Sequence, residues 1–275
     1  MSNPAPIDLA PMPRAYTSLL RRATEVFEAD DRVRALWMHG AVERGAQDAG
    51  SDLDLNITVA AAALEEMTQQ HEDWIAQITD WVSLQQMGAG PGWYALTPTC
   101  ERVDFLLESV DELPSTPHRR RLLVFDKDDL SQALPPAADP PPDPTSMEFF
   151  IREPLRQMAN FPIIFIREDW LMGVVAVQQI HQYLYLLFAE ENKPQPPTGP
   201  KQWSHKLSAT RRHQLKLLPV PQPDPVSIRE CWKQAVALLL SEAPPIAAHH
   251  GVEWPIHLEH AVLTYLRGAG YPPTP

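Results

Sequence analysis

The chain has 275 residues, of which 44% are hydrophobic and 21% charged. This is the composition of a folded globular protein and excludes wholesale disorder. Its 23 Lys and Arg against 35 Asp and Glu leave a net charge of −12, which disfavours a general nucleic-acid binder and favours cationic ligands. Two cysteines are too few for a disulfide scaffold or a Cys-rich zinc site.

The N-terminal segment has no basic stretch followed by an apolar one, so we expect no signal peptide and a cytoplasmic location. The most apolar segment, residues 170–189, contains Gln178, Gln179, His181 and Gln182. These polar residues favour a buried helix over a membrane span.

The first half of the chain mixes helical and strand patterns. Apolar residues at helical spacing predict a first helix around Leu19–Phe27. Residues 33–38 are almost all apolar, which is typical of a central strand buried on both faces. Residues 53–59 alternate strictly between apolar and polar and predict a second strand. Further along we expect a helix over 64–82 and strands over 93–96, 102–107 and 122–125.

A proline-rich run marks a domain boundary. Residues 134–144 contain six prolines, which lack the amide donor that helices and central strands need. We therefore predict a first domain over 1–134, a linker over 135–145 and a second domain over 146–275. The second half has helical periodicity only, and later prolines, including Pro244 and Pro245, are expected to end helices. The predicted helices lie near 146–160, 168–191, 204–218, 226–241 and 257–268, which makes the chain α+β: a mixed sheet with flanking helices, followed by an all-α domain.

Two acids open the second predicted strand. Asp52 and Asp54 are two residues apart, so both project from one face, about 6–7 Å apart along the backbone. No basic residue lies between them, and two such carboxylates repel each other unless a cation sits between them. Mg²⁺ prefers hard oxygen ligands of this kind.

A third acid, Asp104, lies on another predicted strand and faces away from its neighbours Val103 and Phe105. Three carboxylates that converge from neighbouring strands are the smallest set of side chains that metal-assisted phosphoryl or nucleotidyl transfer needs.

The turn before the acid pair carries a resemblance. His39-Gly40-Ala41, ten further residues and then Asp52-Leu53-Asp54 resemble the signature of the nucleotidyltransferase superfamily, and Ser51 to Asp54 is similar to its Ser-Asp-apolar-Asp core. Asp104 fits the third acid of that family, and residues 121–128 resemble its following strand and Asp-rich turn. The resemblance covers residues 15–135. With a helical second half, the chain is similar to the aminoglycoside and lincosamide adenylyltransferases.

The resemblance implies a nucleotidyltransferase-type first domain and Mg²⁺-dependent transfer of a nucleoside monophosphate, with ATP as co-substrate and pyrophosphate as product. It implies that three aspartates bind metal and are catalytic, namely Asp52, Asp54 and Asp104. It assigns the nucleotide to the Gly40–Ala41 turn, Ser51 and Lys201. Arg44 lies four residues beyond Gly40, where we expect a basic side chain to meet the triphosphate. The alternative to nucleotide binding is a solvated loop residue for Arg44 and an exposed lysine for Lys201.

Ala41 departs from the family pattern, which usually has Ser at that position to contact the phosphates. Backbone amides of such a turn still bind phosphate. The departure leaves a second interpretation open: a catalytically weak or inactive member that binds nucleotide or serves as a toxin–antitoxin partner.

The charge of −12 favours a cationic, hydroxyl-rich acceptor, an aminoglycoside before a lincosamide. Glu168 and Asp169 are candidates to meet it, with helix capping as the alternative role. We expect no nucleic-acid partner and no membrane. The sequence leaves the acceptor, the general base and the oligomeric state open.

Overall fold

The computed structural model describes residues 7–115, 121–136, 138–196, 198–199 and 201–272. The chain divides into two compact units, Met1–Ala138 with Pro197–Gln202 and Asp139–Pro196 with Trp203–Pro275. The sequence pattern placed residues 198, 199, 201 and 202 in the helical half, whereas they group with the first unit.

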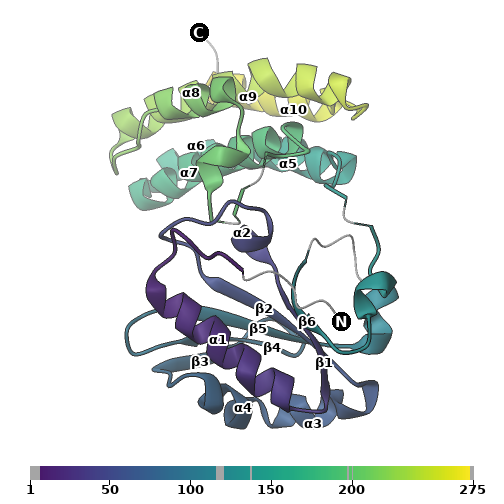
Figure 1. The fold of residues 1–275 in the computed structure, drawn as a ribbon. Helices are drawn as coiled ribbons and strands as arrows, with labels where there is room; N and C mark the ends of the chain where they lie inside the picture. Colours follow the sequence, from purple (N-terminus) through teal and green to yellow (C-terminus); the bar gives the residue numbers. More distant parts are fainter. Residues whose placement is uncertain (1–6, 116–120, 137, 197, 200, 273–275) are drawn as a thin grey trace. The chain divides into compact units, whose positions relative to one another are not determined.

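The first unit is built on a six-stranded sheet in the order β3-β4-β5-β2-β1-β6 (Figure 1). β2 runs parallel to β5, and the other neighbouring strands pair antiparallel, so the sheet is mixed. The strands are β1 (Val33–Met38), β2 (Leu53–Val59), β3 (Ser83–Gln86), β4 (Gly92–Leu96), β5 (Arg102–Ser109) and β6 (Leu122–Asp126).

One face of this sheet packs against α1 (Arg14–Ala29), α3 (Leu64–Gln69) and α4 (His71–Ile78). The apolar residues of β2 face this core and are completely buried, from Leu53 to Val59 at every second position. Because side chains alternate along a strand, the polar residues of β2 lie on the opposite face. The short elements of this unit are α2 (Gly40–Glu43), η1 (Ala61–Ala63), η2 (Val110–Ser115) and η3 (Leu130–Ala133).

The second unit is entirely helical in its described part. Aspartates cap two of its long helices. Asp143 accepts hydrogen bonds from Thr145 N and Ser146 N at the start of α5, and Asp224 caps α9 in the same way. Its elements are α5 (Pro144–Met158), α6 (Phe161–Arg167), α7 (Trp170–Glu191), η4 (Trp203–Lys206), α8 (Ala209–Leu217), α9 (Pro225–His249) and α10 (Ile256–Gly268).

α7 is long and apolar enough to cross a membrane by length and composition alone. It also supplies the core of the helical unit, since Val177, Ile180, Leu184 and Leu187 are buried against residues of α5 and α9. This packing agrees with the buried helix expected from its interrupted apolar run.

The predicted α+β class is confirmed: a mixed sheet with flanking helices precedes a helical region. Pro244 and Pro245 do not end a helix, because α9 continues through them to His249. Two prolines remove two backbone hydrogen bonds, but Ala243, Ile246 and Ala247 remain buried in the core, and this packing keeps the segment helical.

Two further expectations differ in detail. The helix expected over 64–82 is interrupted into α3 and α4 and ends at Ile78. β3 was not predicted, because Ser83-Leu-Gln-Gln86 forms an edge strand with two exposed glutamines and has no apolar alternation.

Candidate metal and nucleotide site

Three carboxylates meet at one end of the central strands. Asp52 directly precedes β2, Asp54 lies on β2, and Asp104 lies on β5 beside Asp54 in the parallel register. One oxygen from each carboxylate lies within 4.8 Å of the others. The parallel pairing of the two strands thus brings together acids that are 50 residues apart in the sequence.

The apolar neighbours of these acids hold them in place. Leu53 and Leu55 on β2, and Val103 and Phe105 on β5, are completely buried in the core on the other face. Since successive side chains point to opposite faces, burial of these residues turns the carboxylates toward the polar face.

Gly40 is shaped to receive Asp54. Its φ of +75° is in the left-handed region that favours glycine, and a Cβ built on it would lie 2.0 Å from Asp54 Oδ2. The backbone of His39 also donates a hydrogen bond to the carbonyl oxygen of Asp54, at 3.2 Å. The glycine of the turn therefore makes room for the carboxylate itself.

Two basic side chains enter the cluster. Arg102 binds Asp104 through two hydrogen bonds, Nε to Oδ1 at 2.7 Å and Nη2 to Oδ2 at 2.8 Å, and its Nε lies 3.5 Å from Asp52 Oδ2. Lys201 Nζ lies 2.7 Å from Asp52 Oδ2. Sequence reasoning missed Arg102, although its position two residues before Asp104 on one strand placed it on the same face.

Among the described residues, no basic side chain forms a hydrogen bond or an ion pair with Asp54. Burial raises its pKa to about 7, the charges of Asp52 and Asp104 add to the rise, and Lys201 and Arg102 oppose it. Three acids with two bases leave an excess of negative charge at Asp54, the carboxylate that neither base binds directly. Oxygen ligands with such an excess fit a divalent cation like Mg²⁺, which would be held by Asp52 and Asp54 with Asp104 beside them.

Residues 198, 199, 201 and 202 pack over the turn that leads to these acids. Gln202 Nε2 donates to the carbonyl oxygen of Ala46 at 2.9 Å and to Asp48 Oδ2 at 2.8 Å. Gly199 lies against Ala41, since a Cβ built on Gly199 would be 3.2 Å from the Ala41 Cβ. These contacts explain how a lysine so distant in the sequence reaches Asp52.

The other residues expected to bind nucleotide take different positions. Arg44 Nη1 donates to the carbonyl oxygen of Thr198 at 3.0 Å, so the structure ties it to this segment and pairs it with none of the three aspartates. Ser51 forms hydrogen bonds with Asp48 that shape the turn before β2. Gly40 and Ala41 begin α2, where the first backbone N–H groups have no acceptor within the helix.

In the helical unit, Asp169 Oδ1 accepts a hydrogen bond from Met172 N and caps α7. Glu168 ends α6 with a left-handed backbone conformation. Asp169 therefore has the capping role that the sequence left as its alternative.

No family model matches the sequence, and no curated protein matches it. Among solved structures, the chain is similar to an aminoglycoside 6-adenyltransferase from Bacillus subtilis, at 13% identity and a TM-score of 0.42, covering 92% of this chain and 97% of that one. It is also similar to a nucleotidyltransferase-like protein from Exiguobacterium sibiricum 255-15, at 14% identity and a TM-score of 0.37, covering 92% of this chain and 88% of that one.

Proposed function

We propose that this protein is a metal-dependent nucleotidyltransferase that transfers a nucleoside monophosphate from a nucleoside triphosphate, with ATP the first candidate, to a hydroxyl group of a small molecule. The convergence of Asp52, Asp54 and Asp104 carries the proposal, together with the raised pKa of Asp54. Acids that crowd together at a cost in charge repulsion are expected where a cation and phosphate groups bind.

The proposed reaction forms a bond between the acceptor oxygen and the α-phosphorus, breaks the bond from that phosphorus to the β-phosphate oxygen, and releases pyrophosphate. Asp52 and Asp54 would hold a Mg²⁺ ion, which would neutralise charge on the phosphates when bound. Asp104 would complete the group or accept the proton of the acceptor hydroxyl. The protein's own cations then act on the nucleotide: Lys201, and Arg102 beside it, offer N–H donors to phosphate oxygens.

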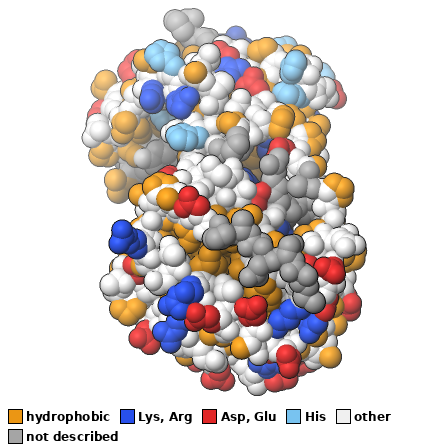
Figure 2. All heavy atoms as spheres, viewed as in Figure 1, with side chains coloured by type: hydrophobic (Ala, Val, Ile, Leu, Met, Phe, Trp, Pro, Cys, Tyr) orange, Lys and Arg blue, Asp and Glu red, His pale blue; other side chains and the backbone are white. Residues whose placement is uncertain are grey.

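For the acceptor we propose a cationic, hydroxyl-rich small molecule, an aminoglycoside before a lincosamide. The net charge of −12 supports it. Acidic and basic side chains of the described residues are interspersed on the face seen in Figure 2. A cytoplasmic location is part of this proposal.

A second candidate is a nucleotide-binding protein without turnover. Ala41 favours it, because the alanine offers no hydroxyl to a phosphate, and so does the ion pair between Lys201 and Asp52, which already neutralises one carboxylate. The two candidates share a ligand and differ in chemistry.

The test combines binding with turnover. Thermal unfolding is measured with ATP, Mg²⁺ and both together, and pyrophosphate release is then measured against a panel of aminoglycosides and lincosamides. Asp52→Asn is expected to abolish release while the fold is kept, whereas Asp80→Asn, an exposed aspartate of the same unit, leaves release unchanged. Stabilisation by ATP with Mg²⁺ but no release with any acceptor favours the second candidate. Full activity in pure Asp52→Asn contradicts the metal assignment.

A further inference from the structure

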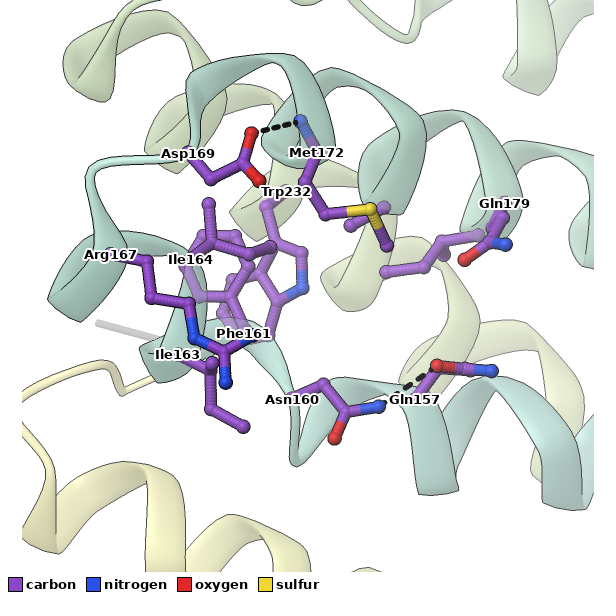
Figure 3. A pocket seen from close by; sticks show the side chains of 12 residues that line it. Gln157, Asn160, Phe161, Ile163, Ile164, Arg167, Asp169, Met172, Gln179 and Trp232 are labelled. Carbon is purple, nitrogen blue, oxygen red and sulfur yellow. Dashed lines mark hydrogen bonds between the residues drawn. The ribbon is translucent and has the colours of Figure 1, made fainter.

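The helical unit contains a cavity of about 250 Å³, lined by residues from α5, α6, α7 and α9 and by the turns next to α6 (Figure 3). Every lining residue lies in the second unit, and none belongs to the site of the three aspartates. An apolar cavity of about 150 Å³ holds a benzene ring, so this one has room for a larger aromatic molecule.

Aromatic and aliphatic side chains form its inner wall. Phe161 and Trp232 stack with ring centroids 4.0 Å apart and planes 14° apart, and both are 1% exposed. Ile164 and Ile180 are also buried beside them, while Met172 and Ile163 are partly exposed. A wall of this kind favours a flat apolar ligand.

The cavity is also lined by a residue with a hydrogen-bond donor, the indole nitrogen of Trp232. Among the described residues, no side chain or backbone oxygen accepts a hydrogen bond from the indole nitrogen of Trp232. Figure 3 shows this nitrogen turned toward the open space between Met172 and Asn160. A donor that opens onto the cavity favours a ligand that brings an acceptor oxygen.

The rim carries one unpaired positive charge. Arg167 has no carboxylate within ion-pair distance in the described ranges, and its guanidinium lies beside the cavity near Ile163 (Figure 3). The one acid that lines the cavity, Asp169, is engaged with the N-terminus of α7 through Met172 N at 3.0 Å. The side chain of Gln179 also lines the cavity and adds an amide to the same rim.

From these contacts we infer that the cavity is a binding site for a small aromatic carboxylate, separate from the proposed transfer reaction. The ring lies against the wall formed by Phe161, Trp232 and Ile164. A ligand oxygen accepts from the indole N–H, and Arg167 supplies the charge that distinguishes a carboxylate from a neutral analogue.

The test is calorimetric titration of the full chain with 2-naphthoate and with its neutral amide, 2-naphthamide. We expect naphthoate to bind about tenfold more tightly than naphthamide, the difference that one charge-assisted contact makes. Arg167→Gln is expected to remove that preference and leave naphthamide binding unchanged. Trp232→Phe, which keeps the stack with Phe161 and removes the donor, is expected to weaken both ligands.

A steric variant and its control complete the design. Ala176→Leu extends a lining residue of α7 into the cavity and is expected to lower both affinities at least about tenfold, whereas Val175→Leu on the exposed side of the same helix leaves them unchanged. Asp52→Asn is also expected to have no effect, so the outcome is independent of the proposed function. The inference is wrong if naphthoate does not bind, if naphthamide binds equally well, or if Ala176→Leu binds like the wild type. If Ala176→Leu does not fold, the comparison of naphthoate and naphthamide binding to Arg167→Gln decides, because Arg167 is exposed and its substitution leaves the core unchanged.

Discussion

Lys201 Nζ lies 2.7 Å from the Asp52 carboxylate, although 149 residues separate them in the sequence. Lys201 is 60% exposed, so the ion pair contributes little to stability, about 0–1 kcal/mol for pairs of this exposure. Its importance is for the charge of the site: it neutralises one of the three acids before any ligand binds.

Lys201→Gln is therefore expected to have opposite effects on two ligands. Removing the positive charge should tighten binding of Mn²⁺ alone and weaken binding of ATP in the presence of Mg²⁺, because the cation gains a free carboxylate and the triphosphate loses a donor. Calorimetry measures both affinities. Lys216→Gln, an exposed lysine on α8, serves as the control. A change of the same sign for both ligands would show that Lys201 acts on the fold rather than on charge.

Gly40→Ala tests the close approach of Gly40 and Asp54. The substitution adds a Cβ 2.0 Å from Asp54 Oδ2 at a φ of +75°, so it displaces the carboxylate in addition to straining the backbone. Gly45→Ala is a matched control, because Gly45 has a φ of +63° and no atom within 4 Å of its Cβ position.

Both variants are expected to lose about 1–3 kcal/mol of stability from backbone strain, measured by urea denaturation. Only Gly40→Ala should also lose binding of Mn²⁺. Equal Mn²⁺ affinity in the two variants would show that the position of the Asp54 carboxylate does not depend on this glycine.

The sequence predicted the part of the acid site that follows from the alternation of side chains along one strand. It placed Asp52 and Asp54 on one face correctly, because the buried Leu53 and Leu55 determine that face. The parallel pairing that sets Asp104 beside Asp54 depends on the strand order, which local pattern does not encode. The contact of Lys201 with Asp52 depends on packing of a loop whose composition indicates only that it is exposed.

The helical unit was predicted less completely for a related reason. Proline rules describe local backbone hydrogen bonds, whereas α9 continues through Pro244 and Pro245 because residues on both sides of the pair are buried. Tertiary packing outweighs the local preference there. In the same way, a residue pattern cannot reveal that Trp232 lacks an acceptor.

Asp54 should make stability depend on pH. Its pKa is about 7 in the folded protein, against 3.8 for the ordinary carboxyl, so the folded state holds a proton that the unfolded state has released. Stability from this group is present below about pH 4 and is lost as the pH rises to about 7, with no further change above. Partial exposure and screening reduce the effect to about 1–3 kcal/mol.

The measurement is urea denaturation at pH 5 and pH 8, without divalent cations. Asp54→Asn is expected to be more stable than the wild type at pH 8 and to flatten this part of the profile, while Asp80→Asn follows the wild type. Addition of Mg²⁺ should stabilise the wild type at pH 8, because bound metal favours the ionised carboxylate. An unchanged profile in Asp54→Asn would falsify the raised pKa.

A second ion pair stabilises the same sheet away from the acid site. Arg121 binds Glu108 of β5 through both terminal nitrogens, one of them at 2.8 Å, and its side chain is 1% exposed. Thr58 Oγ1 donates to Glu108 at 2.9 Å, and Trp37 Nε1 donates to that hydroxyl at 2.9 Å. The network thus connects β1, β2 and β5 to the residue just before β6.

Glu108→Gln is expected to cost about 3–5 kcal/mol, because it leaves the buried guanidinium of Arg121 without a negative charge. The double variant Glu108→Leu with Arg121→Met should recover most of that loss, since neither charge is then left alone. Asp128→Asn, which breaks the more exposed pair between Arg34 and Asp128, should cost only about 0–1 kcal/mol. Urea denaturation of the variants measures these differences. If Glu108→Gln costs no more stability than Asp128→Asn, water reaches the Arg121 guanidinium and the pair of Arg121 with Glu108 is not desolvated. If the double variant is as unstable as Glu108→Gln, the loss of stability comes from the hydrogen bond of Thr58 and not from the uncompensated charge.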